Sequence, residues 1–297
     1  MDTKTAFFAL VGKPYVGKST LLNALVGQKI AIVSHRPQTT RTRITGTLTE
    51  GDTQYVFLDT PGAIKPKNKL GESMLRSIRE GTSDIDAAVL VVEPKGDITK
   101  AEEDFIARFE REKTPAILVI NKIDLVKDKT RLAERITKYA ERFDFSAIVP
   151  ISAKTGDGIL RLKSELSKFV VESVHFFPDD ALTDQPERVI AAEYVRERLL
   201  WHLEDEVPHG IAVVTEQMKE SNDILKISCV IYCERKNHKG IIIGKNGETL
   251  KKIATEARMA LEDFFGVKVY LQCWVKVKED WRNREGLLRS FGFGDSN

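Results

Sequence analysis

The sequence predicts an α/β domain in which helices cover both faces of a mostly parallel sheet, followed by a smaller α+β module. Buried apolar runs alternate with helix-like segments from Phe7 to about Val171. A glycine-rich loop separates the first apolar run from the first helix-like run, and a stretch with two prolines and several acidic residues later interrupts the periodicity. We therefore expect residues 1–173 to form the first domain, residues 174–186 a linker and residues 187–297 the second domain.

Length and composition agree with two domains. The 297 residues suffice for two hydrophobic cores, and 46 basic against 44 acidic side chains leave a net charge of only +2. Three cysteines and the lack of a signal peptide favour reduced thiols in the cytoplasm. No apolar run reaches the roughly 20 residues that span a bilayer, so any membrane contact is expected to be peripheral.

The first motif lies between the apolar run FFALV and the helix-like run that begins at Leu21. It reads G-x-x-x-x-G-K-S, whose backbone N–H groups cradle phosphates while Lys18 neutralises their charge and Ser19 binds Mg²⁺. The alternative is a chance match in a turn. The nucleotide contacts are expected from Gly12, Lys13, Pro14, Tyr15, Val16, Gly17, Lys18, Ser19 and Thr20.

A second motif, Asp59-Thr60-Pro61-Gly62, follows the apolar run YVFL. A carboxylate at this strand end can hold Mg²⁺ through water opposite Ser19, and the Gly62 N–H can reach the γ-phosphate. An ordinary proline–glycine turn is the alternative interpretation. Ala63 follows the motif and is expected to border the same nucleotide.

Two further motifs point to the base. Asn121-Lys122-Ile123-Asp124 ends the run AILVI, and a carboxylate there accepts two hydrogen bonds from guanine that adenine cannot donate. Ser152-Ala153-Lys154 follows the run AIVPI and is expected to give a backbone N–H to guanine O6, with Lys154 along the base. GTP and GDP are therefore the expected nucleotides.

Two polar loops, residues 34–43 and 63–71, lie between the regular elements and are expected to move with nucleotide state. The first contains Thr39 and Thr40, one of which should join the Mg²⁺ shell when the γ-phosphate is present. We expect Thr40, with Thr39 as the alternative. The predicted metal ligands are thus Ser19, Thr40 and Asp59.

The second half is predicted to run helix, strand, strand, a glycine-punctuated helical pair, strand and a tail helix. Gly244 to Gly247 form a GXXG loop between the paired helices, as in modules that clamp about four nucleotides of single-stranded RNA. A solvated helix face with a glycine turn is the alternative. The expected RNA contacts are Arg235, Lys236, Lys239, Gly240, Ile243, Gly244, Lys245, Asn246, Gly247, Lys251 and Lys252.

The four nucleotide motifs in this order resemble the translation-factor-like small GTPases, and the second half resembles a type II KH domain. Together with RPQTTR, HKGIIIGKNG and the closing run KVYLQCWVKVKEDWR, nearly the whole chain resembles the Era family of bacterial ribosome-assembly GTPases. The resemblance implies an α/β P-loop GTPase domain with an α+β KH domain. It also implies GTP, Mg²⁺ and the single-stranded 3′ end of small-subunit rRNA as partners during 30S maturation, with a peripheral membrane association attributed to the family. We expect a monomer that binds RNA and not DNA.

The chain departs from the family pattern at two positions. Tyr15 replaces an Asn whose side-chain oxygen helps to hold an activating K⁺ in related GTPases, so it is either a tolerated surface variant or a residue that weakens K⁺ activation. Ala63 stands where Ras-like proteins carry a water-orienting glutamine, so intrinsic hydrolysis should be slow. No side chain can be identified from the sequence as the general base. The candidates for assisting hydrolysis are Lys18, Thr40 and Gly62.

Two other functions are consistent with the same sequence. One is an RNA-binding assembly factor or RNA chaperone that holds nucleotide with little turnover, which Tyr15 and Ala63 favour. The other is a membrane-associated switch that would use Phe176, Phe177 and the basic tail, although we expect these two aromatic residues to seal packing between the domains.

Overall fold

A computed structural model describes residues 3–36, 38–62, 66, 68–80 and 84–293, without the side chains of residues 78–80. The chain divides into two compact units. Unit 1 contains Met1–Ala31, Thr40–Lys65 and Met74–Asp184, and unit 2 contains Ile32–Thr39, Pro66–Ser73 and Gln185–Asn297. Parts of both predicted switch loops therefore pack with unit 2. The expected domain boundaries themselves stay a prediction.

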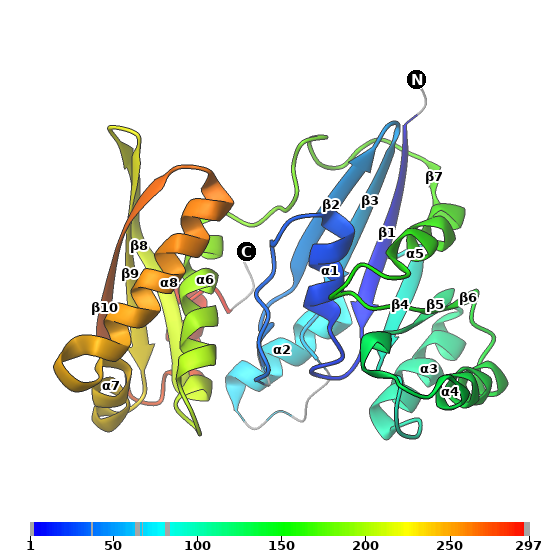
Figure 1. The fold of residues 1–297 in the computed structure, drawn as a ribbon, viewed down its shortest axis with the longest axis horizontal. Coiled ribbons are helices and arrows are strands. Elements are labelled where there is room, and N and C mark those ends of the chain that lie inside the picture. Colours follow the sequence, from blue (N-terminus) through cyan, green and yellow to red (C-terminus); the bar gives the residue numbers. More distant parts are fainter. Residues whose placement is uncertain (1–2, 37, 63–65, 67, 81–83, 294–297) are drawn as a thin grey trace. The chain divides into compact units, whose positions relative to one another are not determined.

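Unit 1 is built on a mostly parallel sheet, as the sequence predicts (Figure 1). Its described strands follow the order β2-β3-β1-β4-β5-β6, and β7 pairs with β1. Only β2 against β3 and β7 against β1 are antiparallel. The strands are β1 (Lys4–Val11), β2 (Ile44–Glu50), β3 (Thr53–Asp59), β4 (Ala87–Val92), β5 (Ala116–Ile120), β6 (Ala147–Pro150) and β7 (Val171–Glu172).

Helices cover both faces of this sheet. On one face Phe105, Ile106 and Tyr139 pack against β4 and β5, which are buried throughout. Leu21 and Leu162 are fully buried on helices that lie on the other face (Figure 1). The helices are α1 (Lys18–Val26), α2 (Lys69–Glu80), α3 (Lys100–Glu112), α4 (Lys129–Arg142) and α5 (Ile159–Leu166), with 3₁₀ turns at Ile123–Leu125 and Ser167–Phe169.

Unit 2 has the predicted α+β order. Its sheet runs β10-β9-β8, with β9 antiparallel to β8 and parallel to β10. Buried residues of α6 and α8 form one core with the inner face of this sheet. The elements are α6 (Glu187–His202), β8 (Ile211–Ser221), β9 (Ile224–Cys233), α7 (Lys236–Ile243), α8 (Glu248–Phe265), β10 (Lys268–Val277) and α9 (Glu285–Ser290), with 3₁₀ turns at Pro208–Gly210, Lys245–Gly247 and Trp281–Asn283.

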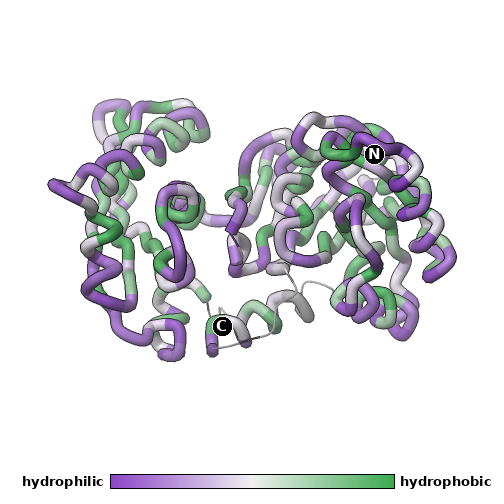
Figure 2. The backbone as a smooth tube through the Cα atoms, turned by 60° about the horizontal axis from the view of Figure 1, so that its bottom comes forward, coloured by the Kyte–Doolittle hydropathy of each residue, from purple (hydrophilic) through white to green (hydrophobic). Residues whose placement is uncertain are grey.

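Hydrophobic and hydrophilic residues interleave along the helices of both units (Figure 2). None of the helices in the described ranges combines the length and the apolarity that crossing a membrane requires.

The predicted linker begins against strands β3 and β1 of unit 1. The Gln54 side chain accepts hydrogen bonds from the N–H groups of Phe176 and Phe177 and donates one to the Phe177 carbonyl oxygen. The Phe176 ring meets Phe7 of β1 edge to face, with centroids 5.0 Å apart. Phe176 thus packs within unit 1.

Candidate functional site

The four nucleotide motifs meet at one edge of the unit 1 sheet. They follow the carboxyl ends of β1, β3, β5 and β6, which are parallel to their neighbours in the order β3-β1-β4-β5-β6. Ligands of open α/β sheets bind at this edge. Ala63 lies outside the described residues.

Close backbone approach explains two of the motif glycines. Gly17 has a φ of 95°, and a Cβ there would lie 2.3 Å from the Asn121 Nδ2 atom. A Cβ on Gly62 would lie 2.7 Å from the backbone nitrogen of Pro14. The phosphate loop therefore packs directly against the DTPG and NKID segments, with no room for a side chain at either position.

Lys18 points into its own loop. Its buried Nζ donates hydrogen bonds to the carbonyl oxygens of Gly12 and Lys13, at 3.2 and 3.0 Å. Burial lowers the pKa of Lys18 to about 8, although the nearby Asp59 charge opposes that shift. A bound anion at this loop would stabilise the charged form of Lys18, which burial disfavours. The geometry of the loop therefore suits phosphate.

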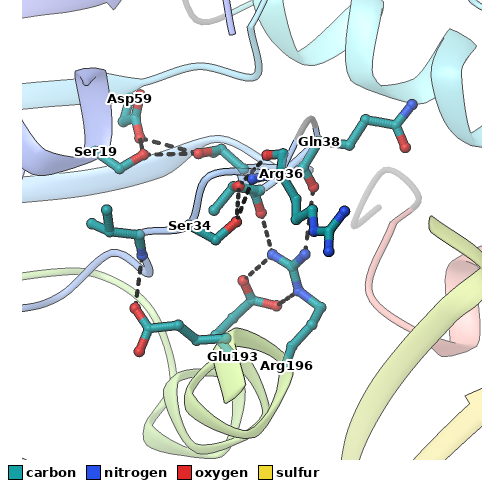
Figure 3. Close-up of polar contacts among 11 residues, drawn as sticks. Ser19, Ser34, Arg36, Gln38, Asp59, Glu193 and Arg196 are labelled. Atoms are coloured by element: carbon teal, nitrogen blue, oxygen red, sulfur yellow. Dashed lines mark hydrogen bonds and ion pairs between the residues drawn. The ribbon is translucent and has the colours of Figure 1, made fainter. Parts of the chain in front are cut away.

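Ser19, Thr40 and Asp59 form a small oxygen-rich cluster (Figure 3). The Ser19 hydroxyl donates to Asp59 Oδ2 at 2.6 Å and lies 2.9 Å from the Thr40 hydroxyl. The other oxygen of Asp59, Oδ1, is buried and has no hydrogen-bond partner in the described part of the chain. Burial raises the pKa of Asp59 to about 6, against the opposing effects of Lys18 and the two hydroxyls.

This cluster fits Mg²⁺ better than a transition metal. Hydroxyl and carboxylate oxygens are hard ligands, and Mg²⁺ usually takes only one or two protein ligands with phosphate and water. Across the described ranges, no group of three or more His, Cys, Asp or Glu side chains could hold a metal. The hydroxyl of Thr39 contacts Ser34 and the Arg36 carbonyl instead, so Thr40 is the better placed of the two threonines.

Asn121 connects three motifs. Its buried amide nitrogen donates to the Val16 carbonyl oxygen at 2.8 Å, and its Oδ1 accepts from the N–H groups of Lys122 and Ala153. Asp124 is exposed and accepts a hydrogen bond from the Ser152 hydroxyl at 2.7 Å. The residues predicted to select guanine are thus brought together. The remaining motif residues, Thr20, Thr60, Pro61, Ile123 and Lys154, lie within the same four segments.

Sequence reasoning missed two acidic partners of the motif lysines. Glu102 is fully buried at the start of α3, and its carboxylate lies 3.3 Å from Lys13 Nζ and 3.7 Å from Arg135. Glu93 pairs with Lys122 at 2.6 Å. The capping box of Thr99 and Glu102 signals a helix start but says nothing about a partner in a distant loop.

Helix α6 binds Val33, Gln38 and Thr39, which lie in or just before the predicted first switch loop of residues 34–43, and these contacts are within unit 2 (Figure 3). The buried Arg196 guanidinium binds Glu193 through two nitrogens and donates to the carbonyl oxygens of Gln38 and Thr39. Glu197 accepts the Val33 N–H at 2.8 Å. We call Glu193, Arg196 and Glu197 the α6 clamp. No motif marks these residues, and sequence reasoning missed them.

The GXXG loop lies between α7 and α8. Gly244 and Gly247 have φ values of 73° and 81°, and Asn246 has a φ of 53°, a conformation that Asn tolerates better than most residues. Among the candidate RNA contacts, Ile243 is partly buried. The basic candidates Arg235, Lys236, Lys239, Lys245, Lys251 and Lys252 are all exposed.

Each of the two units matches a known protein family. Residues 7–122 match the family described as 50S ribosome-binding GTPase, and residues 206–282 match the KH domain family. GTPase Era of Clostridioides difficile is 48% identical over 98% of this chain and 99% of its own length. The chain belongs to the Era family. GTPase Era of Ruminiclostridium cellulolyticum is 45% identical over 99% of this chain and 98% of its own length.

Solved Era structures share the fold. Aquifex aeolicus Era bound to GDP and aluminium fluoride aligns with a TM-score of 0.92 at 38% identity, covering 99% of this chain and 100% of that chain. Era in complex with MgGDPNP and nucleotides 1506–1542 of 16S ribosomal RNA aligns with the same TM-score, identity and coverage. As a member of this family the chain is a GTPase, with a P-loop domain followed by a KH domain.

Proposed function

We propose that this GTPase is a GTP- and Mg²⁺-dependent switch that binds the single-stranded 3′ end of small-subunit rRNA and assists 30S assembly. The proposal rests on one observation: the same chain has all four guanine-nucleotide motifs in unit 1 and a GXXG loop with exposed basic residues around it in unit 2. The relative solved with MgGDPNP and 16S rRNA nucleotides supports it.

In the nucleotide site, backbone N–H groups of residues 12–19 bind the phosphates and Lys18 neutralises their charge. Ser19, Thr40 and Asp59 would hold Mg²⁺, which neutralises phosphate charge when bound. Asp124 accepts the guanine N1–H and N2–H groups, and a backbone N–H of the Ser152-Ala153-Lys154 segment faces O6. Asn121 positions these groups through its three hydrogen bonds to the motif segments.

Hydrolysis transfers the γ-phosphoryl group of GTP to water and releases GDP. Lys18 and the Gly62 N–H stabilise charge on the γ-phosphate, and Thr40 closes over it. No dedicated side chain is proposed as general base, so intrinsic turnover is slow and RNA or the ribosomal subunit accelerates it. Tyr15 offers no amide oxygen to K⁺, and we propose that it weakens K⁺ activation.

The α6 clamp provides the coupling step. Thr39, whose carbonyl oxygen binds Arg196, directly precedes Thr40, whose hydroxyl lies at Ser19. Movement of Thr40 with the γ-phosphate therefore pulls on a segment that α6 holds, and α6 leads directly into the KH sheet.

The proposal also covers the cellular location and the oligomeric state of the protein. We place the switch in the cytoplasm as a monomer, and a peripheral membrane contact is measurable by sedimentation with anionic lipid vesicles. The rival is an RNA-binding factor that holds nucleotide with little turnover, which Tyr15 favours.

Steady-state GTP hydrolysis in KCl and Mg²⁺ tests the proposal, with and without single-stranded RNA copying the 3′ end of small-subunit rRNA. We expect that RNA to raise turnover, whereas a scrambled RNA should raise it less. Tight RNA binding with negligible turnover in every condition would favour the rival function.

A further inference from the structure

The outer face of the unit 2 sheet has an unusual composition for a sheet surface. Along β10 the inward residues Val269, Leu271, Cys273, Val275 and Val277 pack in the core, and every outward residue is exposed. The outward residues include Tyr270 and Trp274, whose exposed fractions are 53% and 58%. Two large aromatic side chains on one open face indicate a binding surface more than a solvated strand.

Strand register arranges this face in rows. Lys219 of β8, Lys226 of β9 and Tyr270 of β10 form one row, because Lys226 is in register with both of the others. The next row contains Gln217, Ser228 and Gln272, and the following row ends at Trp274. Tyr270 and Trp274 are four residues apart on one strand, a separation of about 13 Å. We call this surface the outer platform: Lys219, Lys226, Lys268, Tyr270, Gln272 and Trp274.

The charge of the outer platform points to an anionic partner. Lys219 and Lys226 face each other directly across antiparallel strands, an arrangement of like charges that costs stability. Neither lysine lies within ion-pair distance of an acidic side chain in the described ranges. Glu216, an acidic residue at the edge of this surface, is paired with Lys276 at 3.2 Å.

Within the described part of the chain, the segment after β10 covers the neighbouring end of the same face. The Tyr232 ring stacks on Phe291, with centroids 4.5 Å apart, and Trp281 donates a hydrogen bond to the Gly210 carbonyl oxygen. Those contacts cover the end of β9 at Tyr232, which lies one row beyond the row that ends at Trp274. They leave Tyr270, Trp274 and the two facing lysines exposed.

We propose that the outer platform is a second single-stranded RNA site of the KH domain, separate from the GXXG loop, in which bases stack on Tyr270 and Trp274. Exposed aromatic rings on a sheet with lysines beside them suit unpaired bases and their phosphates. Helices α7 and α8 carry the GXXG loop, whereas the platform lies on the sheet face opposite the core that α6 and α8 cover (Figure 1). The inference rests on the proposed RNA-binding function and extends it to longer RNA.

Binding of two oligouridines to the full chain tests the inference. A short probe of about four nucleotides matches the GXXG loop alone, and a long probe of about 20 nucleotides can occupy both sites. The paired change Tyr270→Ala and Trp274→Ala should weaken long-probe binding about five- to a hundredfold, the cost of losing a stacked base, and leave short-probe binding unchanged. Leu160→Ala, at an exposed apolar residue of unit 1, is the control.

Tryptophan fluorescence gives a direct readout. Trp274 and Trp201 are exposed and Trp281 is buried. Long RNA should therefore quench fluorescence in the wild type, quench it less in Trp274→Phe and quench it as in the wild type in the control Trp201→Phe, after the lost tryptophan signal is allowed for. Unchanged long-probe affinity in the paired variant together with unchanged quenching in Trp274→Phe would overturn the inference. Loss of self-association instead of RNA binding, measured by light scattering, would also overturn it and assign the platform to a second copy.

Lys245→Glu separates the two RNA proposals. If it abolishes short-probe binding and leaves part of the platform-dependent long-probe binding, both sites exist. If it has no effect on either probe while the platform variants do, the GXXG assignment fails and the platform stands. Thermal unfolding of each variant confirms that folding is retained.

Discussion

At the scale of single residues, hydrogen bonds across chain segments organise the nucleotide site. Asn121 contacts the phosphate loop, its own strand end and the S-A-K segment. Gly17 leaves room for that amide. These contacts join the segments that carry Asp124 and its hydrogen-bond partner Ser152. In the proposed site, specificity for guanine therefore depends on one exposed carboxylate held between buried segments.

Replacing that carboxylate should change the base preference. Asp124→Asn loses two charge-assisted hydrogen bonds to guanine, and we expect GTP affinity to fall about 10- to 100-fold. Xanthine carries an oxygen where guanine has its amino group, so the new amide can donate to it and XTP should bind better than GTP. Fluorescence titration with both nucleotides measures this, and Asp128→Asn, a helix-cap change nearby, should leave GTP affinity unaltered.

Tyr15 has a φ of 71°, a left-handed conformation that Asn adopts at lower cost. Tyr15→Asn should therefore stabilise the protein by about 0.5–1 kcal/mol, measured by denaturant unfolding. The same change should restore K⁺ activation, seen as faster GTP turnover in KCl than in NaCl. Tyr15→Phe serves as the control, and equal K⁺ activation in wild type and Tyr15→Asn would contradict the idea.

At the scale of elements, strands of unit 1 position the motifs and helix α6 of unit 2 holds a switch segment. The parallel strands place four strand ends at one edge, which requires no special side chains beyond the motifs. The α6 clamp works differently, because buried charged groups bind backbone atoms of Val33, Gln38 and Thr39.

The clamp should therefore set the coupling between RNA and hydrolysis. Arg196→Lys keeps a positive charge beside Glu193 but loses the planar fork that reaches the Gln38 and Thr39 carbonyl oxygens. We expect RNA stimulation of GTP turnover to fall at least about fivefold while GTP affinity changes little. Arg188→Lys, on the same helix, is the matched control; equal stimulation in all three proteins would rule out a coupling role.

The start of the linker carries a pH-sensitive contact. His175 donates to Asp179 and to the Asp52 carbonyl oxygen, and these two hydrogen bonds raise the pKa of His175. The protonated ring therefore adds stability that is fully present below its unfolded pKa of about 6.5 and is lost as the pH rises through the folded pKa. Compared with wild type, His175→Asn should show a flatter dependence of unfolding free energy on pH above about 6.5. Asp179→Asn should flatten it similarly, and an unchanged slope in both would refute the contact's role.

At the scale of the whole molecule, a near-neutral net charge conceals local basic surfaces. The net charge of +2 contrasts with the exposed lysines and arginines around the GXXG loop. RNA affinity should accordingly depend on salt through a few phosphate contacts, and global charge should matter little.

Lys245→Glu tests this directly. Removing one phosphate contact should weaken binding across all single-stranded sequences and flatten the slope of log affinity against log salt by about 0.7. The exposed Lys129→Glu in unit 1 changes net charge equally and should leave the slope unaltered. A weaker affinity for one sequence alone would point to base recognition by Lys245 instead.

The fold class, the four nucleotide motifs and the GXXG loop could all be predicted from the sequence, because they depend on short-range chemistry. A phosphate loop needs its glycines and lysine at set spacings, and strand alternation needs only local apolar patterns. The family comparison confirms the GTPase and KH fold and the GTPase activity.

Contacts between residues far apart in the chain could not be predicted from the sequence and come from the tertiary structure. The pairing of Lys13 with Glu102 and the hydrogen bond from Arg196 to the Thr39 carbonyl oxygen each join chain positions that no local pattern relates. It also placed Thr40, and not Thr39, beside Ser19 and Asp59. Such contacts depend on how strands register and helices pack, and many sequences satisfy the same local pattern without forming them.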